Sequence, residues 1–328
     1  MLKGKDLILA TRKFAKDDKG KSWYYTLSTL LILSACLFAS YYSTNILLKS
    51  VLSIITGLVV VRMFVIYHDY LHHSILKDSL PARILFSLFG LYVMAPTSIW
   101  KRSHDYHHKH NSKLFTAYIG SYPIYTKSKY LAASKSERTT YLFIRHPLTI
   151  LFGYFFSFMY GMSIRSLLNS PRKHIDSIFA IILHITLITG IFIYGDWSIF
   201  VFVYFIPLFV ACAMGSYLFY AQHNFPDTKI SDKDHWDYAD AALLSSSYMD
   251  LNPVMDWFTA NIGYHHIHHI NAKIPFYNLP KVYEAMNEFQ HVGRTSLSPR
   301  DIWNCLKLKV WDPDSQRMLT LKEVYQQV

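Results

Sequence analysis

Long apolar stretches alternate with polar segments along the chain and predict helices that span a membrane. Four stretches approach or exceed the length of about 20 residues that a bilayer requires. They are residues 24–48, 51–67, 176–194 and 198–220. Two shorter stretches, 82–96 and 148–162, fall below that length, so we expect them to lie in the interface or to re-enter. The alternative is that both cross.

The polar segments between these stretches carry histidines at helical spacing. These are His68 and His72 in "HDYLHHS", His104, His107 and His108 in "HDYHHKHN", and His265, His268 and His269 in "NIGYHHIHHINAKIPFYNL". On a helix, positions i, i+3 and i+4 project from one face. Crowded imidazoles repel one another when protonated, and a divalent metal between them removes that repulsion. The spacing therefore favours a metal site over an incidental histidine-rich loop.

A further histidine, His223 in "YAQHNF", is the first polar position after a long apolar run. It raises the number of candidates to nine, whereas tetrahedral zinc takes four ligands and octahedral ions take six. The count indicates two metals. To form one site, the histidines must lie on the same side of the membrane, which two transmembrane hairpins allow.

The distribution of charge predicts which side that is. Basic residues are frequent in residues 1–22, whereas the opposite ends of the hairpins offer only Lys49 and Asp196. By the positive-inside rule, the histidines and both termini face the cytoplasm. Topology and anionic lipid headgroups account for the formal net charge of +11, and because no nucleic-acid-binding module is recognised, we expect no nucleic-acid partner.

The composition, with 52% hydrophobic residues, fits an all-α integral membrane protein with about four transmembrane helices. We expect a single domain over 1–328: a basic cytoplasmic N-terminus (1–22), transmembrane and interfacial helices with the first two histidine clusters (23–220), and a cytoplasmic helical cap with the third (221–328). In the cap, Ser298 is expected to begin a helix with Pro299 at its first position.

The expected chemistry is oxidation. A two-metal site that faces lipid suggests hydrocarbon as the substrate, and zinc has no redox chemistry, so iron is the better candidate. The scattered cysteines, Cys36, Cys212 and Cys305, form neither a disulfide framework nor a CxxC redox pair.

The ordered clusters resemble the three histidine boxes of the integral-membrane fatty acid desaturases. The boxes are His68-Asp69-Tyr70-Leu71-His72, His104-Asp105-Tyr106-His107-His108 and His265-His266-Ile267-His268-His269. The sequence from "RMFVIYHDYLHH" through "AQHNF" to "NIGYHHIHHINAKIPFYNL" is most similar to the acyl-lipid desaturases of plants and bacteria, the Δ12/ω6 and ω3 group. The resemblance covers roughly residues 50 to 320.

The resemblance implies a set of metal ligands that hold two irons. They are His68, His72, His104, His107, His108, His223, His265, His268 and His269. Asp69 and Asp105 follow the leading histidines of two boxes, a position from which a carboxylate can orient the imidazole rings, with a solvated acid as the alternative at each position. His73, His110 and His266 are extra, and of these His110, three residues beyond His107, is the hardest to exclude. Phe219 stands where some members of the family place an asparagine.

The implied reaction removes two hydrogens from adjacent methylenes of an acyl chain while O2 is reduced to water. The acyl group is lipid-linked or a thioester, with a mono-unsaturated C16 or C18 chain expected, and the chain enters an apolar tunnel that ends inside the protein. Because no fused cytochrome-like domain is recognised, a separate carrier supplies the electrons, either ferredoxin or cytochrome b5 with its reductase.

Two alternatives remain open at this stage. Related enzymes with histidine boxes insert oxygen, so a hydroxylase, ketolase or alkane oxygenase is one of them. The other is a non-enzymatic membrane protein that binds a metal for transport. Transport favours ionisable residues within the spans, where only Arg62 and His184 occur.

Overall fold

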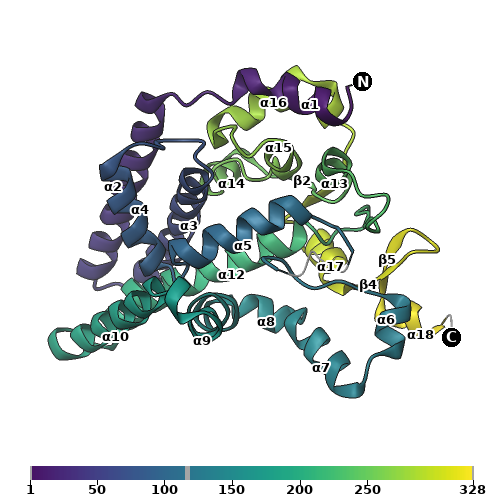
Figure 1. The fold of residues 1–328 in the computed structure, drawn as a ribbon. Helices are drawn as coiled ribbons and strands as arrows, with labels where there is room; N and C mark the ends of the chain where they lie inside the picture. The colour runs from purple at the N-terminus through teal and green to yellow at the C-terminus, as the bar shows by residue number, and fades with distance from the viewer. Residues whose placement is uncertain (1, 115–118, 327–328) are drawn as a thin grey trace.

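The fold is mostly helical in the computed structural model, which describes residues 2–114 and 119–326 (Figure 1). Four helical segments in this part of the chain are long and apolar enough to cross a membrane. They are α2 (Lys19–Tyr42), α3 (Ile46–Leu71), α10 (Asp176–Tyr194) and the segment Trp197–Ala221, which comprises α11 (Trp197–Ile199), η4 (Phe200–Phe205) and α12 (Ile206–Ala221). The predicted fold class and number of spans are therefore confirmed.

The first hairpin differs from the prediction in its boundaries. The predicted span 24–48 runs through the actual turn, since α2 ends at Tyr42 and α3 begins at Ile46. Asn45 starts α3 by accepting a hydrogen bond from the backbone N–H of Leu48 at 3.0 Å. The three residues of this turn, Ser43, Thr44 and Asn45, are polar but uncharged, and long apolar runs flank them, so hydrophobicity averaged over a span does not mark the turn.

Helix α3 is the central span. Of its most apolar window, 61% is buried inside the protein, against 17–28% for the other three spans. It packs closely on α12, because a Cβ atom added to Gly57 would lie only 2.6 Å from Cβ of Val210. The outer spans present large apolar side chains such as Leu31 and Ile185 at the surface, as helices in contact with lipid do.

The two short apolar stretches form short or broken helices. The first contains α4 (Leu80–Tyr92), which is bent by 90° relative to α5 (Thr97–His110). At 1.5 Å per residue, α4 is about 20 Å long, less than the hydrocarbon thickness of about 30 Å. The second contains α8 (Pro147–Leu151) and the π-helix η2 (Tyr154–Arg165), followed by α9 (Ser166–Asn169).

The remaining elements lie outside the spans. Before and between the spans these are α1 (Gly4–Thr11), η1 (Arg12–Phe14), α6 (Lys127–Ala132), α7 (Lys135–Ile144) and η3 (Pro171–Lys173). After the last span come α13 (Tyr238–Leu244), α14 (Pro253–Phe258), α15 (His265–Ile270), η5 (Phe276–Asn278), α16 (Leu279–Ala285), η6 (Asn287–Phe289), α17 (Pro299–Lys307) and α18 (Leu321–Gln326). Ser298 caps α17 by accepting from the N–H of Asp301 at 3.2 Å, as predicted.

The cap contains two small sheets as well as helices. In one, β4 (Leu308–Asp312) pairs antiparallel with β5 (Arg317–Thr320) and parallel with β1 (Tyr125–Thr126). In the other, β2 (Tyr248–Asp250) pairs in parallel with β3 (Arg294–Ser296). The β1–β4 pairing joins the C-terminal part of the chain to a segment between the spans, whereas the other pairings lie within the C-terminal part.

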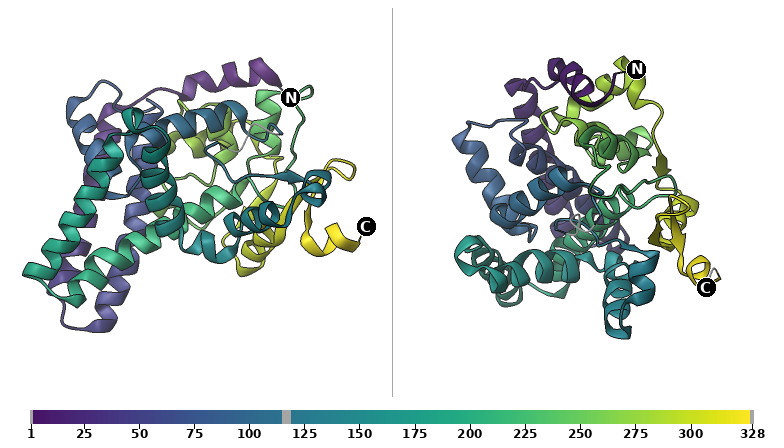
Figure 2. Two further views of the ribbon diagram at one scale, coloured as in Figure 1. Left: turned by 60° about the horizontal axis from the view of Figure 1, so that its bottom comes forward. Right: turned by 45° about the vertical axis from the view of Figure 1, so that its right-hand side comes forward.

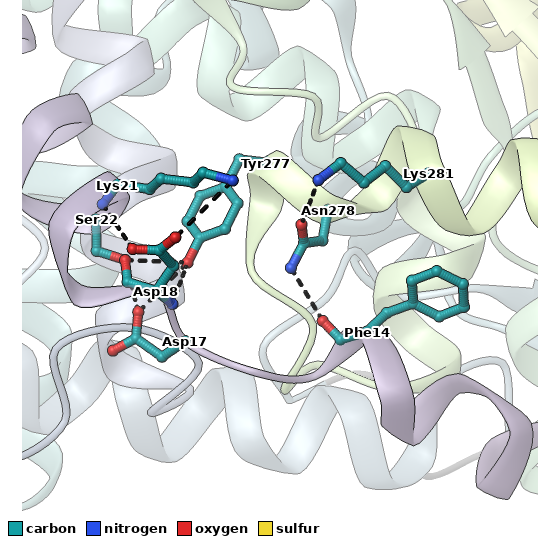
Figure 3. A network of polar contacts seen from close by, with 8 residues as sticks. All are labelled: Phe14, Asp17, Asp18, Lys21, Ser22, Tyr277, Asn278 and Lys281. Atoms are coloured by element: carbon teal, nitrogen blue, oxygen red, sulfur yellow. Dashed lines mark hydrogen bonds and ion pairs between the residues drawn. The ribbon is translucent and has the colours of Figure 1, made fainter.

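The hairpins extend to one side of the molecule, away from the cap and the N-terminal α1 (Figure 2). Helix α1 lies against α13 of the cap, and the chain then crosses to the start of α2. On the way, residues 14–22 contact residues 277 and 278 through a network of hydrogen bonds (Figure 3). Residues 11–18, called the N-terminal strap below, therefore connect the cap to the first span.

Candidate metal centre

Two groups of converging imidazoles lie where the spans meet the cap. The first histidine group consists of His68, His72, His104, His108 and His268, and the second of His107, His223, His265 and His269. Within each group the candidate ligand atoms all lie within 4.8 Å of one another, and every ring is buried. The structure thus brings together all nine predicted histidines in two sets, of five and four.

Four helices position these rings. His68 lies in the last turn of α3 with His72 at its C-cap, the second box lies on α5, and His223 follows the end of α12. The third box forms the short helix α15, so the predicted facial spacing is realised there. Because α3 and α12 pack side by side, their C-terminal ends place His68 and His223 at a similar height along the two helices.

The contacts within the first group are those of a metal site rather than of a hydrogen-bonded cluster. Nε2 of His68 lies 2.8 Å from that of His104 and 3.1 Å from that of His72. His108 continues the row, at 3.1 Å from His104 and 3.0 Å from His268. A neutral Nε2 carries either one proton or one lone pair, so a row of five such atoms makes two hydrogen bonds at most. A cation that accepts all five lone pairs resolves the crowding.

The second group has the same spacing. Nε2 of His223 lies 3.0 Å from that of His107 and 2.9 Å from that of His265, which in turn is 3.1 Å from that of His269. Imidazole nitrogens bound about 2.1 Å from one ion at right angles lie about 3.0 Å apart. Both donor sets therefore fit a divalent transition metal with nitrogen ligands.

Burial favours the neutral form of the four rings that follow the last span. It lowers the pKa of His223 to about 4, and it lowers those of His265, His268 and His269 well below the ordinary value, with neighbouring imidazoles adding to the effect. Neutral rings present the lone pair that a metal requires.

Two rings are oriented by partners on Nδ1. Asp69 Oδ1 lies 3.2 Å from Nδ1 of His68, and its Oδ2 accepts from the backbone N–H of Phe276 at 2.7 Å. The backbone carbonyl of Ser245 lies 2.9 Å from Nδ1 of His223. In both cases the proton is held on Nδ1, so Nε2 faces the group with its lone pair.

Asp105, the second acid of the boxes, lies in a more exposed environment than Asp69. Asp105 pairs with Lys101 at 3.0 Å, and its side chain is 40% exposed. It contacts no imidazole among the hydrogen bonds of the described chain, so the alternative of a solvated acid fits Asp105.

The three extra histidines lie outside both groups. His73 is exposed in the turn that follows the first box, and His110 stacks on Tyr106 with ring centroids 4.0 Å apart. Nε2 of His266 lies 3.1 Å from the carbonyl of Phe289, and burial lowers the pKa of this ring to about 3. His266 thus points away from the site, as its position on the helix predicts.

The sequence matches the model of one protein family, described as fatty acid desaturase, over residues 44–298, more than half of the chain. The chain belongs to the fatty acid desaturase family. It is therefore an enzyme, an oxidoreductase of a membrane-bound family, and the alternative of a non-enzymatic metal-binding protein does not hold.

Individual relatives agree with this assignment at low identity. A fatty acid desaturase of Bacillus subtilis (strain 168) is 26% identical over 98% of this chain and 92% of its own. An sn-1 oleoyl-lipid 12-desaturase of Anabaena variabilis is 24% identical over 88% and 82%. An sn-1 acyl-lipid omega-3 desaturase (ferredoxin) of Nostoc sp. (strain 36) is 24% identical over 87% and 80%.

A small apolar cavity lies between the spans α3 and α12 and the short helices α4 and η2 of this desaturase, near the histidine groups. Its walls are formed by Val60, Val61, Phe64, Val93, Phe158, Ala211, Cys212 and Gly215. Phe64 precedes His68 by four residues on α3, and Gly215 precedes His223 by eight on α12. At 1.5 Å per residue, these separations amount to about 6 Å and about 12 Å along the two helices. The cavity is therefore one to two turns away from the histidines, on the side of the candidate spans.

A second opening connects the first histidine group with the surface. This pocket is lined by His72, Lys101, Asp105, His108, Lys109, Tyr238, Ala272 and Lys273. Two histidines of the first group therefore form part of its wall, and three lysines against one aspartate give its rim a positive charge.

Several contacts of the site were not foreseen from the sequence. Trp100 stacks on His104 at 5.1 Å, and Phe219 lies 5.1 Å from His107, so aromatic rings cover the groups on the side of the spans. The carbonyl of Ser245 and the N–H of Phe276 are backbone groups, for which side-chain identity gives no signal. Trp257 and Tyr264 are packing residues, Trp257 against Arg62 and Tyr264 against Tyr248.

Proposed function

We propose that this desaturase introduces a cis double bond into an acyl chain of a membrane lipid, and that the nine histidines hold two irons. The proposal treats residues 1–328 as one functional domain. The observation that carries it is the coincidence of five and four converging, buried imidazoles with an apolar cavity one to two helical turns away. An apolar cavity beside a redox metal pair suits an unactivated hydrocarbon chain.

The metal pair, when bound and reduced, supplies the oxidising power with O2. Two hydrogens leave adjacent methylenes as the double bond forms, and O2, two electrons and two protons together with these hydrogens yield two molecules of water. Iron is preferred to zinc for this task because zinc has no redox chemistry.

The protein's own residues hold and shield the site. Asp69 and the carbonyl of Ser245 keep the protons of His68 and His223 on Nδ1. Trp100 and Phe219 separate the histidines from lipid and restrict water. The cavity walls determine which methylenes lie beside the metals, and small displacements there change rates by orders of magnitude.

We propose that the histidine groups and both termini face the cytoplasm. The Nε2 atoms of His68 and His104 lie 2.8 Å apart. If the site lies at one membrane face, the segment between these two residues must begin and end on the same side of the membrane. The 90° bend between α4 and α5 is consistent with re-entry. The basic N-terminus then assigns the side.

Reporter fusions test this topology. Fusions after residues 22, 120, 170 and 240 are expected to report the cytoplasm, whereas fusions at Lys49 and Asp196 report the opposite side. An external signal after residue 120 or 170 would show that a short apolar stretch crosses.

The likeness to 12-desaturases and to a ferredoxin-dependent omega-3 desaturase leads us to propose the substrate and the electron donor. The substrate is a mono-unsaturated C16 or C18 chain, lipid-linked rather than a thioester. The donor is a separate carrier, ferredoxin or cytochrome b5 with its reductase. The pocket beside His72 and His108, with its rim of Lys101, Lys109 and Lys273, offers an acidic carrier a short route to the metals.

Expression in a bacterial host without polyunsaturated lipids tests the reaction. With oleate, a reductase and ferredoxin supplied, we expect a new diene in the membrane lipids by mass spectrometry of derivatised fatty acids. Without the carrier, the yield of diene should fall sharply. A new monoene from saturated chains would move the enzyme to another substrate group, and a hydroxy or keto product would establish the oxygen-inserting alternative.

A further inference from the structure

Asp17, in the strap that joins α1 to the first span, contacts the segments that follow two different histidine boxes. We propose that Asp17 is a positioning residue for the first histidine group, acting through Tyr277, Phe276 and Asp69. The inference rests on the proposed two-metal site, because its consequence is the retention of one of the two ions.

The carboxylate of Asp17 accepts hydrogen bonds from three segments. Its Oδ2 accepts from the backbone N–H of Leu76 at 2.8 Å, four residues after His72. Its Oδ1 accepts from the hydroxyl of Ser22, at the start of α2, at 2.6 Å and from that of Tyr277 at 3.4 Å. Figure 3 shows Asp17 together with Ser22 and Tyr277. One side chain therefore joins the loop after the first box, the first span and the segment after the third box.

The loop at Leu76 needs such a partner. His73 and Leu76 both adopt positive φ angles, 55° and 48°. In residues other than glycine, this conformation persists where the surroundings enforce it. The bond from Leu76 N–H to Asp17 is a contact of that kind, and the loop it fixes begins directly after His72.

On the inner side, the same segment reaches a ligand. Phe276, the neighbour of Tyr277, donates its N–H to Asp69, whose other oxygen contacts Nδ1 of His68. The short segment 276–277 is thus held by Asp17 through the hydroxyl of Tyr277 and by Asp69 through the N–H of Phe276. A shift of this segment changes the orientation of Asp69 and, through it, the ring of His68.

The rest of the strap supports this arrangement. Thr11 accepts from the side chain of Asn271 at 3.0 Å, and the carbonyl of Phe14 accepts from that of Asn278 at 3.1 Å. Both partners lie within nine residues of His269. The N-terminal strap is therefore fastened along the segment that leaves the third box.

The test compares Asp17→Ala with Asp18→Ala in the full-length, detergent-purified protein. Asp18 is the matched control, because its side chain caps α2 through the N–H of Lys21 at 3.1 Å, while its backbone N–H, which donates to Tyr277, survives the change. We expect Asp17→Ala to lose one of two metals to a chelator faster than the wild type, and its affinity for that metal to fall by about 10-fold, the lower end of the range for partners that contact a metal ligand directly. Asp18→Ala should release metal at the wild-type rate.

Two further readouts separate positioning from general destabilisation. The visible absorption of the cobalt-substituted protein should change in Asp17→Ala, and Asp17→Asn, which keeps an acceptor oxygen, should restore part of it. If Asp17→Ala does not fold, Tyr277→Phe replaces it in the comparison. Wild-type release rates and spectra in these variants, or equal losses in Asp17→Ala and Asp18→Ala, would overturn the inference. A wild-type protein without two metals would instead contradict the proposed function.

Discussion

Replacement of His268 by alanine is expected to remove metal and to abolish desaturation, whereas replacement of His266 leaves both largely intact. The two residues lie on the same short helix, α15, and are both fully buried. Nε2 of His268 lies 3.0 Å from that of His108 in the first group, but His266 faces the carbonyl of Phe289. Only the first change removes one of the nine proposed ligands.

The His268 replacement is expected to reduce turnover, whereas the His266 replacement is expected to reduce stability. Loss of His268 should lower turnover by more than about 100-fold, since ligand loss exceeds the effect of losing a group behind a ligand. Loss of His266 leaves a buried carbonyl without its partner and should cost about 1–3 kcal/mol of stability. His266→Gln can restore a donor to Phe289 and should recover much of that stability.

Elemental analysis, thermal unfolding and product analysis on the same preparations check this prediction. The wild type and the His266 variants should hold about two irons per chain, in keeping with the two donor groups. One zinc per wild-type chain, or a His266→Ala variant as depleted of metal as His268→Ala, contradicts the assignment.

The histidine site was predictable because its signal is local. Spacing of i, i+3 and i+4 fixes which rings share a helix face, and in the structure His268 lies in the first histidine group whereas His266 faces the carbonyl of Phe289. The spacing did not decide whether His110 belongs to the ligand set, because a residue three positions beyond His107 lies near the same helix face. The structure resolves that case through the contact of His110 with Tyr106.

The features that the sequence did not predict depend on distant contacts. Strand β1 has two residues, and it pairs with β4, more than 180 residues later. The proposed role of Asp17 is of the same kind, since its partners Leu76 and Tyr277 lie 59 and 260 residues away. No periodicity within a short window records such pairings.

The second large expected effect is a loss of turnover when the apolar cavity is filled by a larger side chain at Gly215. A Cβ atom added there would meet Phe158 at 3.6 Å, an ordinary contact, so alanine fits. A leucine side chain extends beyond that point into the cavity that Gly215 lines. If the acyl chain occupies this cavity, Gly215→Leu displaces it from the metals.

We expect Gly215→Leu to retain both metals and to lower kcat/KM for oleoyl lipid by about 100-fold, the effect of misplacing a reacting group by about 1 Å. Gly215→Ala should stay within a few-fold of the wild type. Gly190→Leu is the matched control, because it makes the same change in a span where an added Cβ meets nothing within 4 Å. Metal content and thermal unfolding identify any variant that merely misfolds. Normal turnover by a metal-loaded Gly215→Leu protein would show that the acyl chain lies elsewhere, since a filled cavity cannot also hold the substrate.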